Sequence, residues 1–162
     1  MKILEVLMNL KYEERRGWKR ILPGLTVESV ASHSFSTAFI AMLLAMKKKA
    51  NVEKVVCMAL LHDIAEGVIG DITPEMTDFI EKEETESKVM EYILRDLPDD
   101  IRDKLLALWR EYIEGRSEEA KIVAEADKID MHLQAKRYEK LADTSEFQNH
   151  HLYMKFLEEM EG

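Results

Sequence analysis

The chain has 162 residues, of which 46% are hydrophobic and 34% charged, and its formal net charge is -9 at pH 7. This length supports one hydrophobic core rather than two, so we predict a single domain over residues 1–162. The negative charge disfavours binding to polymeric DNA or RNA, which depends on lysine and arginine, but it allows a small anionic substrate in a cleft with local cations.

Hydropathy and cysteine content restrict the cellular context. The longest apolar run, Phe39 to Met46, is far shorter than the roughly 20 residues that span a bilayer, so we expect no membrane partner. Residues 1–10 interrupt their apolar pattern with Lys2 and Glu5, unlike a secretory signal. Cys57 is the only cysteine and has no partner for an internal disulfide. These features predict a cytoplasmic protein.

Helical periodicity begins at the N-terminus. Apolar residues spaced three and four apart predict a first helix over residues 1–10. Glycine and proline then break the pattern, so we expect a loop over residues 15–26. A second helix should run from about residue 32 to residue 50, with Ser29 or Ser32 as its cap.

The third helix is the most apolar and should be central. Asn51 is a suitable N-cap for it, and Gly67 marks its expected end. Residues 67–74 should form a connection, and Thr73 with Pro74 suits the start of a fourth helix. An acidic run over residues 81–86 could break this fourth helix.

The remaining chain is also helical in pattern. We predict a helix over residues 100–113 that Gly115 stops, and a long helix that begins after Ser117 and runs through Lys140. A last helix is expected within residues 145–160. No strand-like alternation occurs, so the sequence predicts an all-α fold, a compact bundle of several helices.

An adjacent histidine and aspartate, His62 and Asp63, stand at the end of the apolar third helix. Burying both costs several kcal/mol unless each is hydrogen-bonded, ion-paired or bound to a metal. Glu66 follows one helical turn after His62, where a carboxylate could accept a proton from a metal-activated water or hold that water. The alternative is a glutamate that caps or ion-pairs at a solvated helix end.

Two further polar residues interrupt apolar helices. His33 lies near the start of the second helix, and Asp127 lies within the long C-terminal helix. Together with His62 and Asp63 they offer four ligands from three helices for one divalent cation. The nitrogen and oxygen donors suit Mn, Co, Fe, Mg or Zn.

Other polar residues are expected outside this ligand set. Asp130 should hydrogen-bond near the ligands or cap a helix rather than bind metal. His132 and the pair His150 and His151 are expected to be ordinary histidines without a ligand role.

The order of these residues resembles the HD-domain hydrolases, whose signature is an isolated histidine, a His-Asp pair and a distant aspartate. Several segments more narrowly resemble the 5'-deoxynucleotidase branch, which includes the YfbR-like and HD domain-containing protein 2-like enzymes: residues 28–34, 62–66, 70–72 and 126–130. The resemblance covers about residues 10–138. It implies an HD-domain bundle with the metal site between central helices.

The same resemblance implies an activity. The protein would be a metal-dependent phosphohydrolase that removes the 5'-phosphate from deoxynucleoside 5'-monophosphates, with Glu66 and Asp71 as the catalytic carboxylates. The alternatives are an HD-type phosphodiesterase or pyrophosphohydrolase, and a non-catalytic helical binding module with a structural metal. The resemblance and the amphipathic tail over residues 147–160 favour a homodimer, although this tail could equally pack on its own subunit.

The resemblance also implies an arginine and a tryptophan that contact the substrate. Their nearest matches are Arg16 and Trp18, which Gly17 separates. Arg15, Lys19 or Arg20 could take the role of Arg16 in binding phosphate. Trp18 could instead anchor residues 15–26 to the body of the protein.

Overall fold

The computed structural model describes residues 1–71 and 82–161, and it confirms the all-α prediction. In these residues the backbone is helical apart from the connections and an isolated bridge between Glu14 and Ser29. The helices are α1 (Lys2–Leu10), α2 (Arg16–Ile21), α3 (Val30–Lys48), α4 (Val52–Leu61), α5 (Glu66–Ile69), α6 (Lys82–Leu94), α7 (Asp99–Glu114), α8 (Glu118–Tyr138) and α9 (His150–Glu161), with a short 3-10 helix at Ser145–Phe147.

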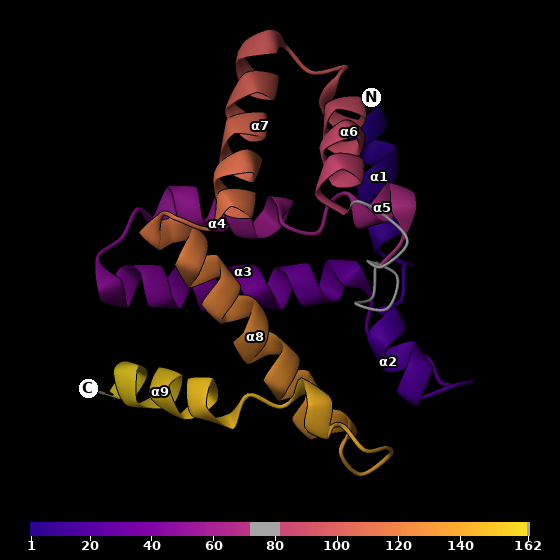
Figure 1. Cartoon of the computed structure of the whole chain (residues 1–162), viewed down its shortest axis with the longest axis vertical. Coiled ribbons are helices and arrows are strands. Elements are labelled where there is room, and N and C mark those ends of the chain that lie inside the picture. Colours follow the sequence, from indigo (N-terminus) through magenta and orange to yellow (C-terminus); the bar gives the residue numbers. More distant parts are fainter. Residues whose placement is uncertain (72–81, 162) are drawn as a thin grey trace.

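Three helices, α3, α4 and α8, form the centre of the bundle. Helix α4 lies along α3, and α8 crosses both (Figure 1). The core between them is made of aliphatic side chains and one methionine: Ala41, Leu44, Val55, Met58, Ala59, Ile122, Val123, Ala126 and Ile129. The expectation that the third predicted helix is central is therefore confirmed.

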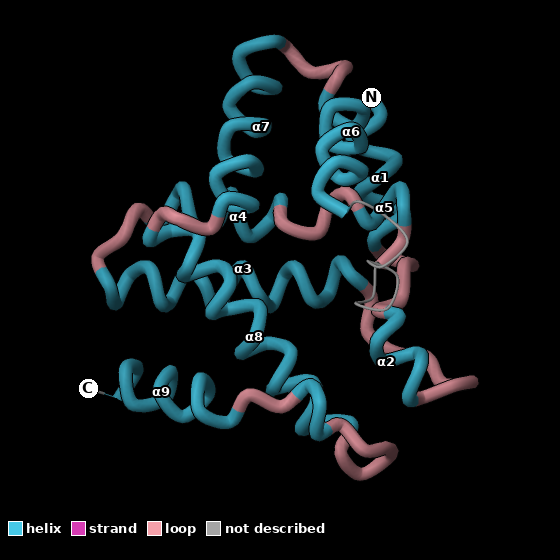
Figure 2. The backbone as a smooth tube through the Cα atoms, viewed as in Figure 1, coloured by secondary structure: helices cyan, strands magenta, loops and turns pink. Residues whose placement is uncertain are grey.

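The outer helices cover this centre from two sides. Helix α1 packs against α5 and α6, while α7 stands on α4 and α8 (Figure 2). Gly67 permits the approach of α1 to α5, because a Cβ atom at this position would lie 2.7 Å from Val6 Cγ1 and 2.9 Å from the Val6 carbonyl oxygen. Helix α9 packs on α8 and α3, so the tail lies on its own subunit.

Local capping signals place the helix ends close to the predicted positions. Ser29 and Ser32 form a capping box at the start of α3, and the side chain of Asn51 accepts a hydrogen bond from Lys54 N. Ser117 caps α8 in the same way, and Gly115 ends α7 with φ 66°.

Two predicted boundaries were wrong. Residues 15–26 are not a continuous loop, because α2 forms within them and buries Trp18 against Tyr138 and Phe147. The third helix ends at Leu61 rather than near Gly67, and turns lead from there to α5. The predicted start of the fourth helix at Thr73 and Pro74 falls outside the described residues.

Helix α3 is also the one helix in the described residues that is long and apolar enough to cross a membrane by length and composition alone. Its buried positions include Ala41, Leu44 and Ala45, which pack in the central core. A core helix of this kind meets the same criteria as a membrane span.

Candidate metal centre and active site

Two buried histidine rings meet between α3 and the turn after α4. His33 Nε2 and His62 Nε2 lie 3.3 Å apart. His62 Nδ1 donates to the Ala59 carbonyl oxygen at 2.6 Å, and His33 Nδ1 lies 2.7 Å from Asp130 Oδ2. A carbonyl and a carboxylate are acceptors, so each ring carries a proton on Nδ1 and directs Nε2 toward the other ring. Two facing Nε2 lone pairs would repel each other, and a proton or a metal cation at this point removes the repulsion.

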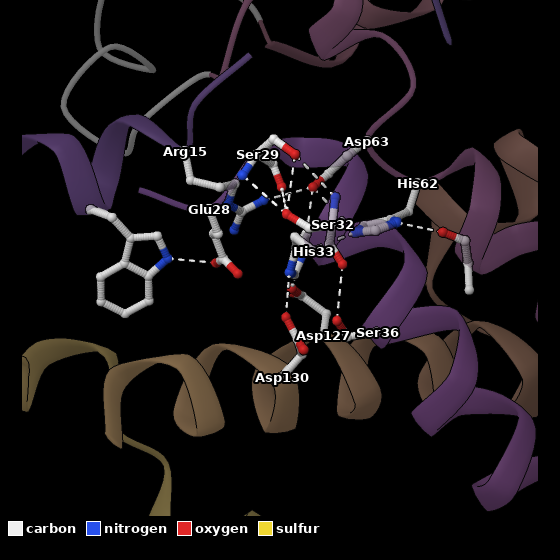
Figure 3. Close-up of polar contacts among 12 residues, drawn as sticks. Arg15, Glu28, Ser29, Ser32, His33, Ser36, His62, Asp63, Asp127 and Asp130 are labelled. Carbon is white, nitrogen blue, oxygen red and sulfur yellow. Dashed lines mark hydrogen bonds and ion pairs between the residues drawn. The ribbon is translucent and has the colours of Figure 1, made fainter. Parts of the chain in front are cut away.

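Two carboxylates lie beside the same point (Figure 3). Asp127 Oδ1 is 3.2 Å from His33 Nε2, while Asp63 Oδ2 is 3.2 Å from His62 Nε2 and 3.6 Å from His33 Nε2. Donors that share one ion at about 2.1 Å lie roughly 3 to 3.5 Å from one another. His33, His62 and Asp127 also present ligand atoms that all lie within 4.8 Å of each other. Three of the four predicted ligands, His33, His62 and Asp127, therefore fit a single divalent cation, and Asp63 lies beside the two histidines.

The pKa values describe a site that favours positive charge. Burial disfavours the imidazolium form of His33, but its hydrogen bonds with Asp127 and Asp130 raise the pKa of this ring to about 10. Burial would raise the pKa of Asp63, yet His62 and Arg15 hold it well below its ordinary value, and His33 lowers the pKa of Asp127 in the same way. Carboxylates that attract a proton to His33 would also stabilise a cation at its Nε2.

Arg15, just before α2, brings a guanidinium to this cluster. Its Nη1 lies 2.7 Å from Asp63 Oδ2, and its side chain is 17% exposed. Burial opposes its charge, but the carboxylates of Asp63, Glu66, Asp71 and Asp127 raise the pKa of Arg15 above its ordinary value. The group thus remains cationic, and its parallel N–H groups suit two oxygens of a phosphate.

Two further carboxylates lie close to Arg15. Asp71 Oδ2 accepts a hydrogen bond from Arg16 N at 2.5 Å, and Gly70, with φ 76°, turns the chain into this position. Glu66 begins α5 and is only 5% exposed. The structure therefore brings both predicted catalytic carboxylates into the electrostatic environment of Arg15 and the ligand cluster.

The two predicted substrate contacts, Arg16 and Trp18, have different neighbours from Arg15. The side chain of Arg16 lies 3.6 Å from Glu13, and its backbone rather than its guanidinium contacts Asp71. Trp18 is 2% exposed, and its Nε1 donates to Glu28 Oε1 at 2.6 Å. This leaves the indole almost no surface for a ligand and matches the alternative in which Trp18 is an anchor.

The other two cations considered for phosphate binding, Lys19 and Arg20, contact glutamates that are not predicted ligands. Lys19 Nζ contacts Glu14 at 2.7 Å, and Arg20 Nη2 contacts Glu146 at 2.6 Å. Of the four basic candidates, Arg15 is the one whose side chain the structure places against a predicted metal ligand.

Comparison with known proteins agrees with this geometry. The HD-domain family profile matches residues 7–160. The chain belongs to the HD-domain family. The chain is 38% identical to the 5'-deoxynucleotidase HDDC2 of Mus musculus over 145 residues, which cover 87% of this chain and 70% of the mouse protein. The Homo sapiens protein of the same name is equally similar, at 38% identity over 87% of this chain and 69% of its own length.

Solved structures show the same HD-domain fold. The PH0347 protein from Pyrococcus horikoshii OT3 superposes with a TM-score of 0.79 at 34% identity, covering 98% of this chain and 94% of that chain. A predicted metal-dependent phosphohydrolase from Magnetospirillum magnetotacticum MS-1 superposes with a TM-score of 0.71 at 26% identity, covering 98% and 80%.

One aromatic residue of this HD domain had no signal in the sequence. The ring of Tyr112, on α7, meets the ring of His62 edge-on, with centroids 6.0 Å apart. Burial, and to a smaller extent the charges of Asp127 and Asp63, raise the pKa of its phenol above the ordinary value. The phenol therefore stays protonated. An aromatic residue on an amphipathic helix is usually a core residue, and only the three-dimensional structure brings Tyr112 close to the site.

Proposed function

We propose that this HD-domain protein is a metal-dependent 5'-deoxynucleotidase, which hydrolyses deoxynucleoside 5'-monophosphates to deoxynucleosides and inorganic phosphate. The observation that carries the proposal is the convergence of two histidines and two carboxylates on one point, with Arg15 and two additional carboxylates nearby. A purely structural metal needs no such additional groups. Similarity to the curated 5'-deoxynucleotidases supports the choice of substrate.

The side chains divide the work of phosphate ester hydrolysis. His33, His62, Asp63 and Asp127 would hold a divalent cation, which when bound neutralises phosphoryl charge and lowers the pKa of water. Arg15 would bind two phosphate oxygens with its guanidinium N–H groups, and Nη1 would then release its contact with Asp63. Glu66 and Asp71 would share proton transfer, one from the attacking water and the other to the departing 5'-oxygen.

Substitution of Glu66 separates a catalytic site from a structural one. Glu66→Gln keeps the shape of the side chain but cannot accept the proton of water, so turnover should fall by roughly 10²- to 10⁴-fold. The metal content, measured by elemental analysis of the purified variant, should equal that of the wild type. Loss of metal or of helical circular dichroism together with activity would instead favour a structural role.

Product analysis distinguishes the alternative enzymes. A 5'-nucleotidase releases free phosphate and a nucleoside from a monophosphate. A phosphodiesterase would leave a monophosphate from a cyclic or linear diester, and a pyrophosphohydrolase would release pyrophosphate from a triphosphate. Either of the last two products, with no release from monophosphates, would replace the proposed reaction.

Four further properties belong to this proposal. The metal is Co, Mn, Fe, Mg or Zn, because the donors are two imidazoles and two carboxylates. The protein acts in the cytoplasm, residues 1–162 form one domain, and the functional unit is a homodimer.

A further inference from the structure

The C-terminal end of α7 stands against α4 and α8, beside the candidate metal centre (Figure 1). A pair of salt bridges fixes this end, because Lys54 Nζ of α4 lies 2.6 Å from Glu111 Oε1 of α7 and 3.5 Å from Glu119 Oε2 of α8. The next residue, Tyr112, is partly buried against the central core, and its ring lies edge-on to the ring of His62. The fold therefore holds one tyrosine side chain next to a predicted metal ligand.

The contact between Tyr112 and His62 does not use the phenol hydroxyl. Both nitrogens of His62 have other neighbours, since Nδ1 donates to the Ala59 carbonyl oxygen and Nε2 faces His33. The two side chains thus meet ring against ring. Within residues 1–71 and 82–161 the hydroxyl forms no hydrogen bond, and it is not among the fully buried oxygens that lack a partner. Because a tyrosine hydroxyl enclosed in a core normally has a partner, this one is open to a ligand.

The charges around the phenol are those of the active site. Burial raises the pKa of Tyr112, and the charges of Asp127, Asp63 and Glu86 act in the same direction. Arg15, the proposed phosphate-binding group, acts in the opposite direction. The phenol therefore shares its surroundings with both the ligand carboxylates and Arg15. Tyrosine is protonated at neutral pH even at its ordinary pKa of about 10, so the group is a neutral hydrogen-bond donor.

We propose that Tyr112 is a further substrate-contacting residue, whose hydroxyl donates a hydrogen bond to an oxygen of the phosphate that Arg15 binds. The inference rests on the proposed function, because it requires a phosphate ester beside His62 and Asp63. Arg15 must release Asp63 before it can bind phosphate, whereas the hydroxyl of Tyr112 has no protein contact to break. A donor held in place by ring packing stabilises the charge on the phosphoryl oxygens without reorganisation.

Tyr112→Phe removes the hydroxyl and keeps the ring that packs against His62. The value of kcat/KM for deoxynucleoside 5'-monophosphates should fall by roughly 10²-fold, as is typical for the loss of one donor to developing negative charge. Helical circular dichroism and the affinity for Mn or Co, measured by calorimetric titration, should equal those of the wild type. A loss of metal affinity that accounts for the lost turnover would instead make Tyr112 a support for His62 and overturn the proposal.

Tyr153, on α9, provides the matched control. It is also partly buried against the central core, and its ring packs near a histidine ring, that of His132, with centroids 5.0 Å apart. His132 is not a predicted metal ligand, so Tyr153→Phe removes the same atoms from a similar environment outside the site. We expect its kcat/KM to stay within about two-fold of the wild type. Equal losses in the two variants would overturn the proposal, because the effect would then not be specific to the site.

Binding of inorganic phosphate tests the same contact without turnover. Calorimetric titration of phosphate into protein loaded with Mn or Co should give about 10-fold weaker binding for Tyr112→Phe, and unchanged binding for Tyr153→Phe. Wild-type affinity in Tyr112→Phe, or no phosphate binding by any of the three proteins, would overturn the assignment. A wild type that binds phosphate but hydrolyses no monophosphate would refute the proposed function alone, because the phosphate affinities would still test the role of Tyr112.

Discussion

At the scale of single residues, Asp130 controls how the site presents His33. Its carboxylate accepts from His33 Nδ1 at 2.7 Å, and this contact leaves Nε2 free to bind a cation. The residue lies three positions after Asp127, a predicted ligand, on the same face of α8. One turn of a single helix therefore supplies both a predicted ligand and the group that orients another predicted ligand.

Asp130→Asn should weaken metal binding without abolishing it. The amide oxygen can still accept the proton of His33 Nδ1, but the negative charge that strengthens Nε2 as a ligand is lost. We expect the affinity for Mn or Co to fall by roughly 10- to 100-fold, measured by isothermal titration calorimetry. Asp100→Asn, at an exposed position on α7, is the control. Unchanged affinity in Asp130→Asn would show that the contact has no part in metal binding.

Arg15 and Arg16 should differ sharply in their effect on turnover. The guanidinium of Arg15 contacts Asp63, whereas Arg16 contributes a backbone N–H to Asp71 that survives any substitution except proline. Arg15→Gln should lower kcat/KM by at least about 100-fold, as expected for the loss of a charged donor at a phosphoryl group. Arg16→Gln should stay within a few-fold in the same phosphate-release assay. A larger loss in Arg16→Gln would reverse this assignment.

The candidate ligands can be picked out from the sequence because their polarity contrasts with that of their neighbours. His33, His62 and Asp127 are polar residues in apolar helices, and burial of such groups demands a partner. The choice between Arg15 and Arg16 was not predictable, because adjacent residues at a helix start have similar local sequence. The direction of α2 decides it, and that depends on contacts with distant residues.

At the scale of elements, local signals explain the helix ends and tertiary contacts explain the exceptions. Ser29, Asn51 and Ser117 cap their helices through neighbours three residues away, so the sequence alone reveals them. Helix α2 forms despite Gly17 because Trp18 and Leu22 are buried in a cluster with Ala135 and Phe147. Gly17 itself lies against Phe147, because a Cβ atom added at this glycine would be 3.4 Å from Phe147 Cε1.

Helix α9 is joined to α8 through a histidine that must be neutral. His132 Nδ1 accepts the backbone N–H of Asn149 at 3.0 Å, and its buried Nε2 has no hydrogen-bond partner in the described residues. The ring also packs near the rings of His150 and Tyr153. Burial, and to a smaller extent the charges of His150 and Lys136, lower the pKa of His132. The charge of Glu139 acts in the opposite direction.

This histidine should make stability depend on pH. Because its folded pKa lies below the unfolded value of about 6.5, the unfolded chain binds more protons between the two values, and stability rises with pH there. As the pH falls from about 7.5 to about 5.5, we expect the wild type to lose stability relative to His132→Gln, whose amide oxygen can accept from Asn149. Denaturant titrations followed by circular dichroism measure both. The same pH dependence in the two proteins would contradict the assignment.

At the scale of the whole molecule, the protein has a negative net charge although its proposed substrate is also an anion. The net charge of -9 is spread over 162 residues, whereas the site concentrates Arg15 and the ligands for a divalent cation in one cluster. Local positive charge in a low-dielectric cleft outweighs distant surface charge. The same surface charge disfavours long nucleic acids, which agrees with a monophosphate rather than a polymer as the substrate.

The most direct test of this account is phosphate release from deoxynucleoside and ribonucleoside 5'-monophosphates by protein stripped with a chelator and refilled separately with Co, Mn, Mg, Fe or Zn. The account predicts no release from the stripped protein, recovery with at least one metal, and faster hydrolysis of the deoxynucleotides. Absence of release from every monophosphate, with metal shown to be bound, would contradict it.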